Sequence, residues 1–184
     1  MTPDEISEVW SRASCLYTHD EVEIAIDAMA GKITERLSHS NPILLCVLQG
    51  GLVVTGKLAA RLPFLLQLDY LHATRYRERT RGADLQWLCK PTLNLKNRVV
   101  LLVDDILDEG ETLHQIRNFC FESGSEEVLC AVLIDKQQER RVPPIKADFV
   151  GLMAPDRYLF GYGMDYKGYL RNAAGIYAVD DKDL

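Results

Sequence analysis

Apolar and polar positions near the N-terminus follow the spacing of amphipathic helices. Two segments begin with a Thr-x-x-Glu capping box, at Thr2–Glu5 and Thr18–Glu21, and Pro3 occupies the first helical position of the first. After the second box, apolar residues recur at helical spacing from Val22 to Leu37. The pattern therefore predicts two N-terminal helices, the second of which buries one face.

From residue 43 onward, short continuous apolar runs alternate with helical patterns and polar breaks. The runs predicted to be strands are Ile43–Leu48, Leu65–His72, Leu85–Leu88, Val99–Val103, Val128–Ile134 and Phe149–Met153, and the predicted helices are Leu52–Leu62 and Leu113–Glu122. Such alternation is typical of an α/β fold with a central, mostly parallel sheet flanked by helices. Residues 142–184 are less regular and are expected to form a small cap. Because no repeat or linker divides the chain, residues 1–184 are predicted to be one domain.

Composition and charge narrow the class of protein. The chain has 184 residues, 47% of them hydrophobic, which is enough to bury a full core. No apolar run reaches the ~18 residues that span a membrane, and the N-terminus lacks the features of a signal peptide. Five scattered cysteines and four histidines without ligand spacing favour a reduced, cytoplasmic protein without a zinc site. The net charge of −6 argues against a nucleic-acid binder.

Most of the chemical information lies in the segment Val99–Thr112. Its apolar run leads directly into Asp104 and Asp105, and an acidic, glycine-containing turn beginning at Asp108 leads into a predicted helix. A loop between a strand and a helix N-terminus is suited to binding an anion, yet carboxylates repel phosphate. Either these acids are solvated, or they bind hydroxyls, Mg²⁺ and a proton while backbone N–H groups and the helix end bind a phosphate.

The string from Val103 to Leu113 resembles the phosphoribosyl-pyrophosphate (PRPP) signature of type I phosphoribosyltransferases, and of their hypoxanthine-guanine branch in particular. The resemblance extends from about residue 43 to residue 171 and implies the type I phosphoribosyltransferase fold, with a small hood over the sheet. It implies that the ribose-phosphate is bound by Asp104, Asp105, Asp108, Glu109, Gly110, Glu111 and Thr112. Asp104 and Asp105 would bind ribose hydroxyls and Mg²⁺, and Asp108 would be the catalytic base.

Further segments resemble the other ligand-binding parts of this family. Leu48–Gly51 resembles the pyrophosphate loop, which implies that Gln49 and Gly50 bind pyrophosphate through backbone amides, with Arg171 reaching the same group. Leu133–Lys136 resembles the strand whose lysine contacts the exocyclic oxygen of a 6-oxopurine.

Pro155–Tyr166 resembles the purine-binding segment. There Tyr158 would stack on the base, the backbone of Leu159 would contact the purine edge, and Asp165 would hold a second Mg²⁺. Taken singly, these residues also fit plainer interpretations: a solvated lysine, a packed tyrosine, a simple turn at Gly50, or an ion pair between Asp165 and Arg171.

Two positions depart from the family pattern. Gln49 stands where the family often has a lysine, so we expect altered affinity rather than lost function. The mobile lid, expected at 75–82, commonly carries a Ser-Tyr pair, and here Arg75-Tyr76 occupies the place. Tyr76 is expected to close on the pyrophosphate, and the roles of Arg77, Arg79 and Arg81 stay open between a closed site and a solvated loop.

The resemblance implies transfer of the phosphoribosyl group from PRPP to N9 of hypoxanthine or guanine, giving IMP or GMP and pyrophosphate, with Mg²⁺ as cofactor. It also implies a homodimer or homotetramer, with no nucleic-acid or membrane partner. Two alternatives stay open. One is a phosphoribosyltransferase-fold regulator that senses a nucleotide, and the other is an enzyme that prefers xanthine or another nucleobase, because a lysine alone cannot rank the 6-oxopurines.

Overall fold

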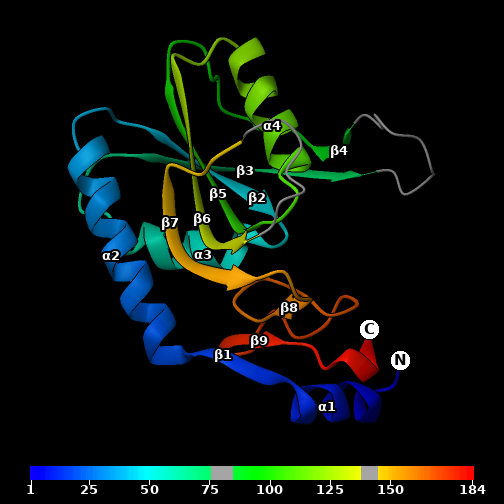
Figure 1. Ribbon diagram of the computed structural model, residues 1–184. Helices are drawn as coiled ribbons and strands as arrows, with labels where there is room; N and C mark the ends of the chain where they lie inside the picture. Colours follow the sequence, from blue (N-terminus) through cyan, green and yellow to red (C-terminus); the bar gives the residue numbers. More distant parts are fainter. Residues whose placement is uncertain (76–84, 138–144) are drawn as a thin grey trace.

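A six-stranded sheet forms the centre of the computed structural model, which describes residues 1–75, 85–137 and 145–184 (Figure 1). In sheet order its strands are β4 (Leu85–Cys89), β3 (Gln67–Arg75), β2 (Ile43–Leu48), β5 (Val99–Leu107), β6 (Glu127–Gln137) and β7 (Phe149–Pro155). Strands β3, β2, β5, β6 and β7 are parallel to one another, and only the edge strand β4 is antiparallel. The predicted mostly parallel α/β sheet is therefore confirmed.

Helices cover both faces of this sheet because its strands carry apolar side chains on alternate sides. On one face, α2 (His19–Leu37) and α3 (Gly51–Ala59) bury residues such as Ile26 and Val54 against Leu101 and Val103 of β5. On the other face, α4 (Glu111–Glu122) packs against other apolar residues of β5, including Leu102. The near-continuous apolar runs in the sequence reflect this double coverage.

A smaller, three-stranded antiparallel sheet forms the hood below the central sheet in Figure 1. Its strands are β1 (Ser14–Thr18), β9 (Gly175–Ala178) and β8 (Leu159–Phe160), and α1 (Pro3–Arg12) lies beside it with the short 3₁₀ helix Asp181–Asp183. The sequence predicts a cap from residues 142–184 alone. That boundary is incomplete, because α1 and β1 from the N-terminal end of the chain also build the hood.

Both predicted N-terminal helices are confirmed, and each begins with the predicted capping box. The strand predicted to end at Val103 is too short, because β5 continues to Leu107, where its backbone still pairs with β6 at Asp135. The sheet therefore carries Asp104 and Asp105 within a strand rather than in a loop. None of the helices in the described part of the chain is long and apolar enough to cross a membrane.

Candidate functional site

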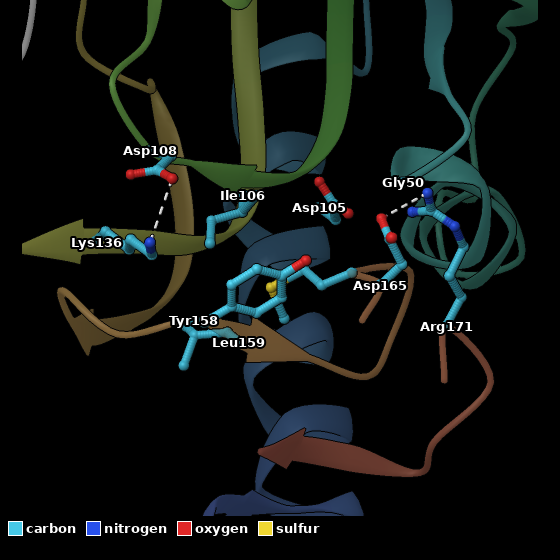
Figure 2. A pocket seen from close by; sticks show the side chains of 10 residues that line it. Gly50, Asp105, Ile106, Asp108, Lys136, Tyr158, Leu159, Asp165 and Arg171 are labelled. Carbon is cyan, nitrogen blue, oxygen red and sulfur yellow. Dashed lines mark hydrogen bonds and ion pairs between the residues drawn. The ribbon is translucent and has the colours of Figure 1, made fainter. Parts of the chain in front are cut away.

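The candidate site lies at the carboxyl ends of β2 and β5, two adjacent parallel strands at the centre of the sheet. The chain leaves β2 toward β3 on one side, whereas β5 leads to β6 on the other, and such a switch point leaves an open crevice for ligands. A cavity of about 400 Å³ occupies it, and Gly50, Asp105, Ile106, Asp108, Lys136, Tyr158, Leu159, Met164, Asp165 and Arg171 line it (Figure 2). Predicted site residues from separate segments of the sequence are thus brought together.

Lys136 and Asp108 form one end of this cavity (Figure 2). The Lys136 Nζ lies 3.2 Å from Asp108 Oδ2 and 3.4 Å from Asp156 Oδ1, and the lysine side chain is only 10% exposed. Strand β6 positions the lysine, because its backbone is paired with Ala154 of β7. A buried ammonium held between two carboxylates has a fixed direction, so Lys136 is an oriented hydrogen-bond donor facing the cavity.

Tyr158 and Leu159 form the wall between the two ends of the cavity. In Figure 2 the tyrosine ring lies across the cavity, between Lys136 on one side and Asp165 on the other. The ring packs edge-on against Tyr166, with 5.7 Å between centroids, and Tyr158 is 42% exposed. A partly exposed aromatic ring that lines a cavity can stack on a planar ligand.

Arg171 and Asp165 form the opposite end, beside Gly50 (Figure 2). An Arg171 nitrogen lies 2.6 Å from Asp165 Oδ1, and another donates to the carbonyl of Gly163 at 2.6 Å. The ion pair that the sequence allowed between Asp165 and Arg171 is therefore present. The backbone N–H of Gly168 also donates to Asp165, so this carboxylate is fixed in place.

Asp105 lies between these two ends, on β5, and its neighbour Asp104 lines the adjoining second cavity. Burial and the charge of Asp105 raise the pKa of Asp104 well above its usual value, and burial raises the pKa of Asp105 as well. Asp105 packs tightly on the pyrophosphate-loop segment, because a Cβ at Gly50 would come within 2.0 Å of its carboxylate oxygen. Only glycine therefore fits at position 50 without displacing the acid.

A second cavity of about 220 Å³ adjoins Asp104 and Asp105 and is lined by the turn that starts α4. Asp108, Glu109, Gly110 and Thr112 are among its lining residues, and Gly110 is the N-cap of the helix. The first backbone N–H groups of a helix lack partners within it, so this end of α4 can bind a phosphate. Glu111 lies in the first helical turn, and Gln49 is exposed beside Gly50.

The acid pair fits a magnesium ion that is shared with a substrate. Mg²⁺ is commonly bound by one or two carboxylates together with substrate oxygens and water. The raised pKa values of these two adjacent carboxylates mean that a bound cation would stabilise their ionised forms. Among the described residues, no group of three or more His, Cys, Asp or Glu side chains converges as a metal-binding cluster. Water or substrate oxygens would complete the coordination of a metal held by this pair.

One part of the predicted site lies outside the described residues, and one residue that contacts Lys136 was not predicted. Tyr76 and Arg77 to Arg81, the expected lid, fall outside the described residues, so their predicted roles stay predictions. Asp156, the second partner of Lys136, was not singled out from the sequence. It lies within the purine-binding segment, but its contact with a lysine of β6 depends on the course of the chain after β7, which the sequence does not show.

Comparisons with known proteins agree with this geometry. The family model "Phosphoribosyl transferase domain" matches residues 13–167. A hypoxanthine-guanine phosphoribosyltransferase of Streptococcus pneumoniae is 32% identical over 158 residues, which cover 85% of this chain and 87% of that protein. The hypoxanthine-guanine-xanthine phosphoribosyltransferase of Tritrichomonas foetus is 29% identical over 85% of this chain and 86% of its own length.

Among solved structures, a hypoxanthine-guanine phosphoribosyltransferase of Bacillus anthracis superposes with a TM-score of 0.85 at 26% identity, covering 91% of this chain and 98% of that one. The chain therefore belongs to the type I phosphoribosyltransferase family, in the group of the hypoxanthine-guanine phosphoribosyltransferases. The resemblance inferred from the PRPP signature is confirmed.

Proposed function

We propose that the protein transfers the 5-phosphoribosyl group of PRPP to N9 of hypoxanthine or guanine, giving IMP or GMP and pyrophosphate, a purine-salvage reaction. One observation carries this proposal. The larger cavity holds an oriented lysine and an acid at one end, the arginine and the loop around Gly50 (the Gly50 loop, residues 48–51) at the other, and Asp105 between them, while the adjoining second cavity is lined by both Asp104 and Asp105. A purine, a ribose and a pyrophosphate follow one another in the same order across the transition state.

The lysine end suits a 6-oxopurine. An ammonium group donates but cannot accept a hydrogen bond, so Lys136 favours a carbonyl over an amino group at purine position 6. The base would lie against Tyr158, with the backbone of Leu159 along its edge. This arrangement supports hypoxanthine and guanine without excluding xanthine.

Asp108 is suited to remove the purine proton. In the proposed reaction, N9 forms a bond to the anomeric carbon of the ribose while the bond from that carbon to the pyrophosphate oxygen breaks, and pyrophosphate leaves with the electron pair. The purine loses its N7 proton to the Asp108 carboxylate, and such general-base assistance typically contributes ~10²–10⁴-fold to the rate. When the purine oxygen contacts Lys136, it competes with Asp108 for the ammonium group and leaves the carboxylate for N7.

The remaining residues bind the ribose, its 5′-phosphate and the leaving group. Asp104 and Asp105 would bind the ribose hydroxyls and Mg²⁺, and Asp165 would hold a second Mg²⁺ through water. The metal supplies positive charge against the pyrophosphate leaving group. Backbone N–H groups from Asp108 to Thr112 would hold the 5′-phosphate. The amides of Gln49 and Gly50, together with Arg171 and Tyr76, would hold pyrophosphate.

We also propose a homodimer or homotetramer that works in the cytoplasm. Leu65, Leu68, Tyr70 and Leu88, on β3 and β4 and the segment before them, are large apolar side chains that are 46–83% exposed, as expected of a surface covered by a second subunit. All five cysteines are free thiols, which supports a reducing compartment. Sedimentation velocity at micromolar concentration tests the oligomer, and a monomer would contradict it.

A panel of bases tests the proposed specificity. The protein is incubated with PRPP, Mg²⁺ and each of hypoxanthine, guanine, xanthine, adenine and uracil, and nucleotide formation is followed by chromatography. We expect hypoxanthine and guanine to react at least about tenfold faster than adenine, because only a 6-oxo group accepts from Lys136. Fastest turnover with xanthine or uracil would assign a different base. Nucleotide binding without any turnover would indicate a regulator instead.

A further inference from the structure

Tyr162 is a buried residue of the purine-binding segment that takes no part in the proposed chemistry. It is 4% exposed, and its hydroxyl lies 2.6 Å from His19 Nδ1 and donates to Glu23 Oε1 at 2.5 Å. Both partners belong to the first turns of α2, a helix that the capping box at Thr18 fixes at its start. The hydroxyl therefore ties the purine-binding segment to a rigid helix.

Glu23 is in turn held by α3, the helix that follows the Gly50 loop, and by Arg61 just beyond that helix. Its Oε1 lies 2.8 Å from Lys57 Nζ, and its Oε2 lies 2.6 Å from an Arg61 nitrogen. Burial alone would raise the pKa of Glu23, but hydrogen bonds from Lys57, Tyr162 and Arg61 lower it to about 2. The acid is therefore ionised at neutral pH, and it links α2, α3 and Tyr162 in one network.

The backbone around Tyr162 needs such support. Its φ is +48°, a left-handed conformation that is unfavourable for a non-glycine residue, and glycines with positive φ flank it on both sides. The neighbouring Gly163 touches the Gly50 loop so closely that a Cβ on it would lie 2.0 Å from the Gly50 carbonyl oxygen. A shift of Tyr162 would therefore be transmitted directly to Gly50.

Gly163 also holds Arg171 in place. Its carbonyl accepts from the Arg171 guanidinium at 2.6 Å, and its N–H donates to the Arg171 carbonyl at 2.9 Å. Both predicted pyrophosphate contacts at that end of the cavity, Gly50 and Arg171, thus rest on the residue next to Tyr162 (Figure 2 labels both). Lys136 lies at the opposite, purine end, where its ammonium group contacts Asp108 and Asp156.

We propose that Glu23 and Tyr162 are positioning residues for pyrophosphate recognition: their hydrogen bond fixes Gly163, and through it Gly50 and Arg171. The inference rests on the proposed function in assigning pyrophosphate to that end of the cavity. It predicts that damage to the network weakens binding of PRPP and of pyrophosphate selectively. Purine binding at the other end stays as it is.

Tyr162→Phe tests the inference with little change in packing, since only the hydroxyl is removed. We expect the KM for PRPP and the Kd for pyrophosphate with Mg²⁺ to rise about tenfold, the scale of one hydrogen bond to a charged group. The KM for hypoxanthine is expected to stay within about twofold. Glu23→Gln is the second variant, and we expect it to change the same constants in the same direction. It keeps the inference testable if Tyr162→Phe folds poorly.

Asp27→Asn is the matched control. Asp27 lies one turn further along α2 and also pairs with Arg61, but its side chain is 64% exposed, and the Tyr162 hydroxyl bonds to Glu23 instead. We expect its PRPP and pyrophosphate constants to equal those of the unmodified protein. Circular dichroism and thermal unfolding establish that each variant is folded at the assay temperature.

Several results would overturn the inference. Folded Tyr162→Phe or Glu23→Gln protein with unchanged pyrophosphate affinity would do so, as would an equal rise in the purine KM or an equal effect of Asp27→Asn. Calorimetric titration with Mg²⁺ and pyrophosphate needs no turnover. An inactive protein whose variants still lose pyrophosphate affinity would therefore refute the proposed function and leave the positioning role supported.

Discussion

Lys136 is the side chain on which the proposed specificity for 6-oxopurines depends. It is nearly buried, and carboxylates lie on two sides of it, one proposed to act as a base and the other, Asp156, without a proposed chemical role. In the proposed function, a purine carbonyl would accept from this ammonium group in competition with the carboxylates. We therefore propose that its position sets which purine enters, and its contact with Asp108 helps to place that carboxylate.

Lys136→Gln is expected to weaken use of 6-oxopurines. The glutamine amide is shorter and neutral, so the charge-assisted bond to the purine oxygen is lost, worth ~1.5–3 kcal/mol or roughly 10–100-fold in kcat/KM for hypoxanthine. Steady-state kinetics with varied hypoxanthine measure this change. Unchanged kcat/KM would show that the lysine does not contact the base.

Asp108→Asn is expected to lower kcat by ~10²–10⁴-fold while the Kd for PRPP changes little, because an amide cannot take the N7 proton. Single-turnover rates and PRPP titrations separate the two quantities. Glu122→Gln, at the exposed far end of α4, is the control and should behave like the unmodified protein. A fully active Asp108→Asn protein would remove Asp108 from the role of base.

At this scale, the sequence predicted residues with a fixed place in a long motif and missed those that act through a fold contact. Asp104, Asp105 and Asp108 follow one another in the PRPP signature, and they line the two cavities. Glu23 was missed because only apolar positions of its helix carry a periodic signal. Its partner Tyr162 is 139 residues away along the chain, so no local pattern could connect the two.

The Gly50 loop shows how an element's local geometry constrains the site. Gly50→Ala would place a Cβ 2.0 Å from the Asp105 carboxylate, so either the loop or the acid must move. We expect a loss of ~1–3 kcal/mol in stability, as for other overpacked sites, together with a higher KM for PRPP. Chemical denaturation and steady-state kinetics measure the two effects.

Gly56→Ala is the matched control in the adjoining helix. Position 56 lies in α3, and a Cβ there would meet nothing within 4 Å. Alanine should therefore raise stability by ~0.5–1 kcal/mol through its better helix propensity and leave the KM for PRPP unchanged. Equal effects of the two substitutions would show that the close contact with Asp105 has no consequence for the site.

Elements with local signals were predictable, and those defined by distant pairing were not. The capping boxes at Thr2 and Thr18 specify both N-terminal helices because each signal lies within a few neighbouring residues. The hood sheet was missed because β1 pairs with β9 across the length of the chain, where no local pattern reports it. The length of β5 was underestimated for the same reason, since its partner β6 extends it past the acid pair.

At the scale of the whole molecule, the ligand cavity lies between the central sheet and the hood, so contacts that join these parts also shape the site. Glu23 makes one such contact, and hydrogen bonds lower its pKa from 4.5 to about 2 despite the opposing effect of burial. A carboxyl group whose pKa is lower in the folded protein than in the unfolded chain stabilises the fold at pH values above its unfolded pKa. This stabilisation is lost as the pH falls through the pKa of the folded state.

The melting temperature of Glu23→Gln should therefore lie below that of the unmodified protein at neutral pH, with the difference shrinking as pH falls from 4.5 to about 2. Differential scanning calorimetry across this range measures the difference. Asp27→Asn, whose side chain is mostly exposed, should show a much smaller effect at every pH. A constant difference for Glu23→Gln would contradict the assigned ionisation.

The balance of products tests the proposed phosphoribosyl transfer more directly than any other measurement. Purified protein is mixed with PRPP, hypoxanthine and Mg²⁺, and IMP and pyrophosphate are quantified in the same samples over time. We expect both to appear in equal amounts, at a rate proportional to enzyme concentration, and guanine to give GMP in the same way. No nucleotide from either base, or pyrophosphate released without nucleotide, would contradict the proposed function.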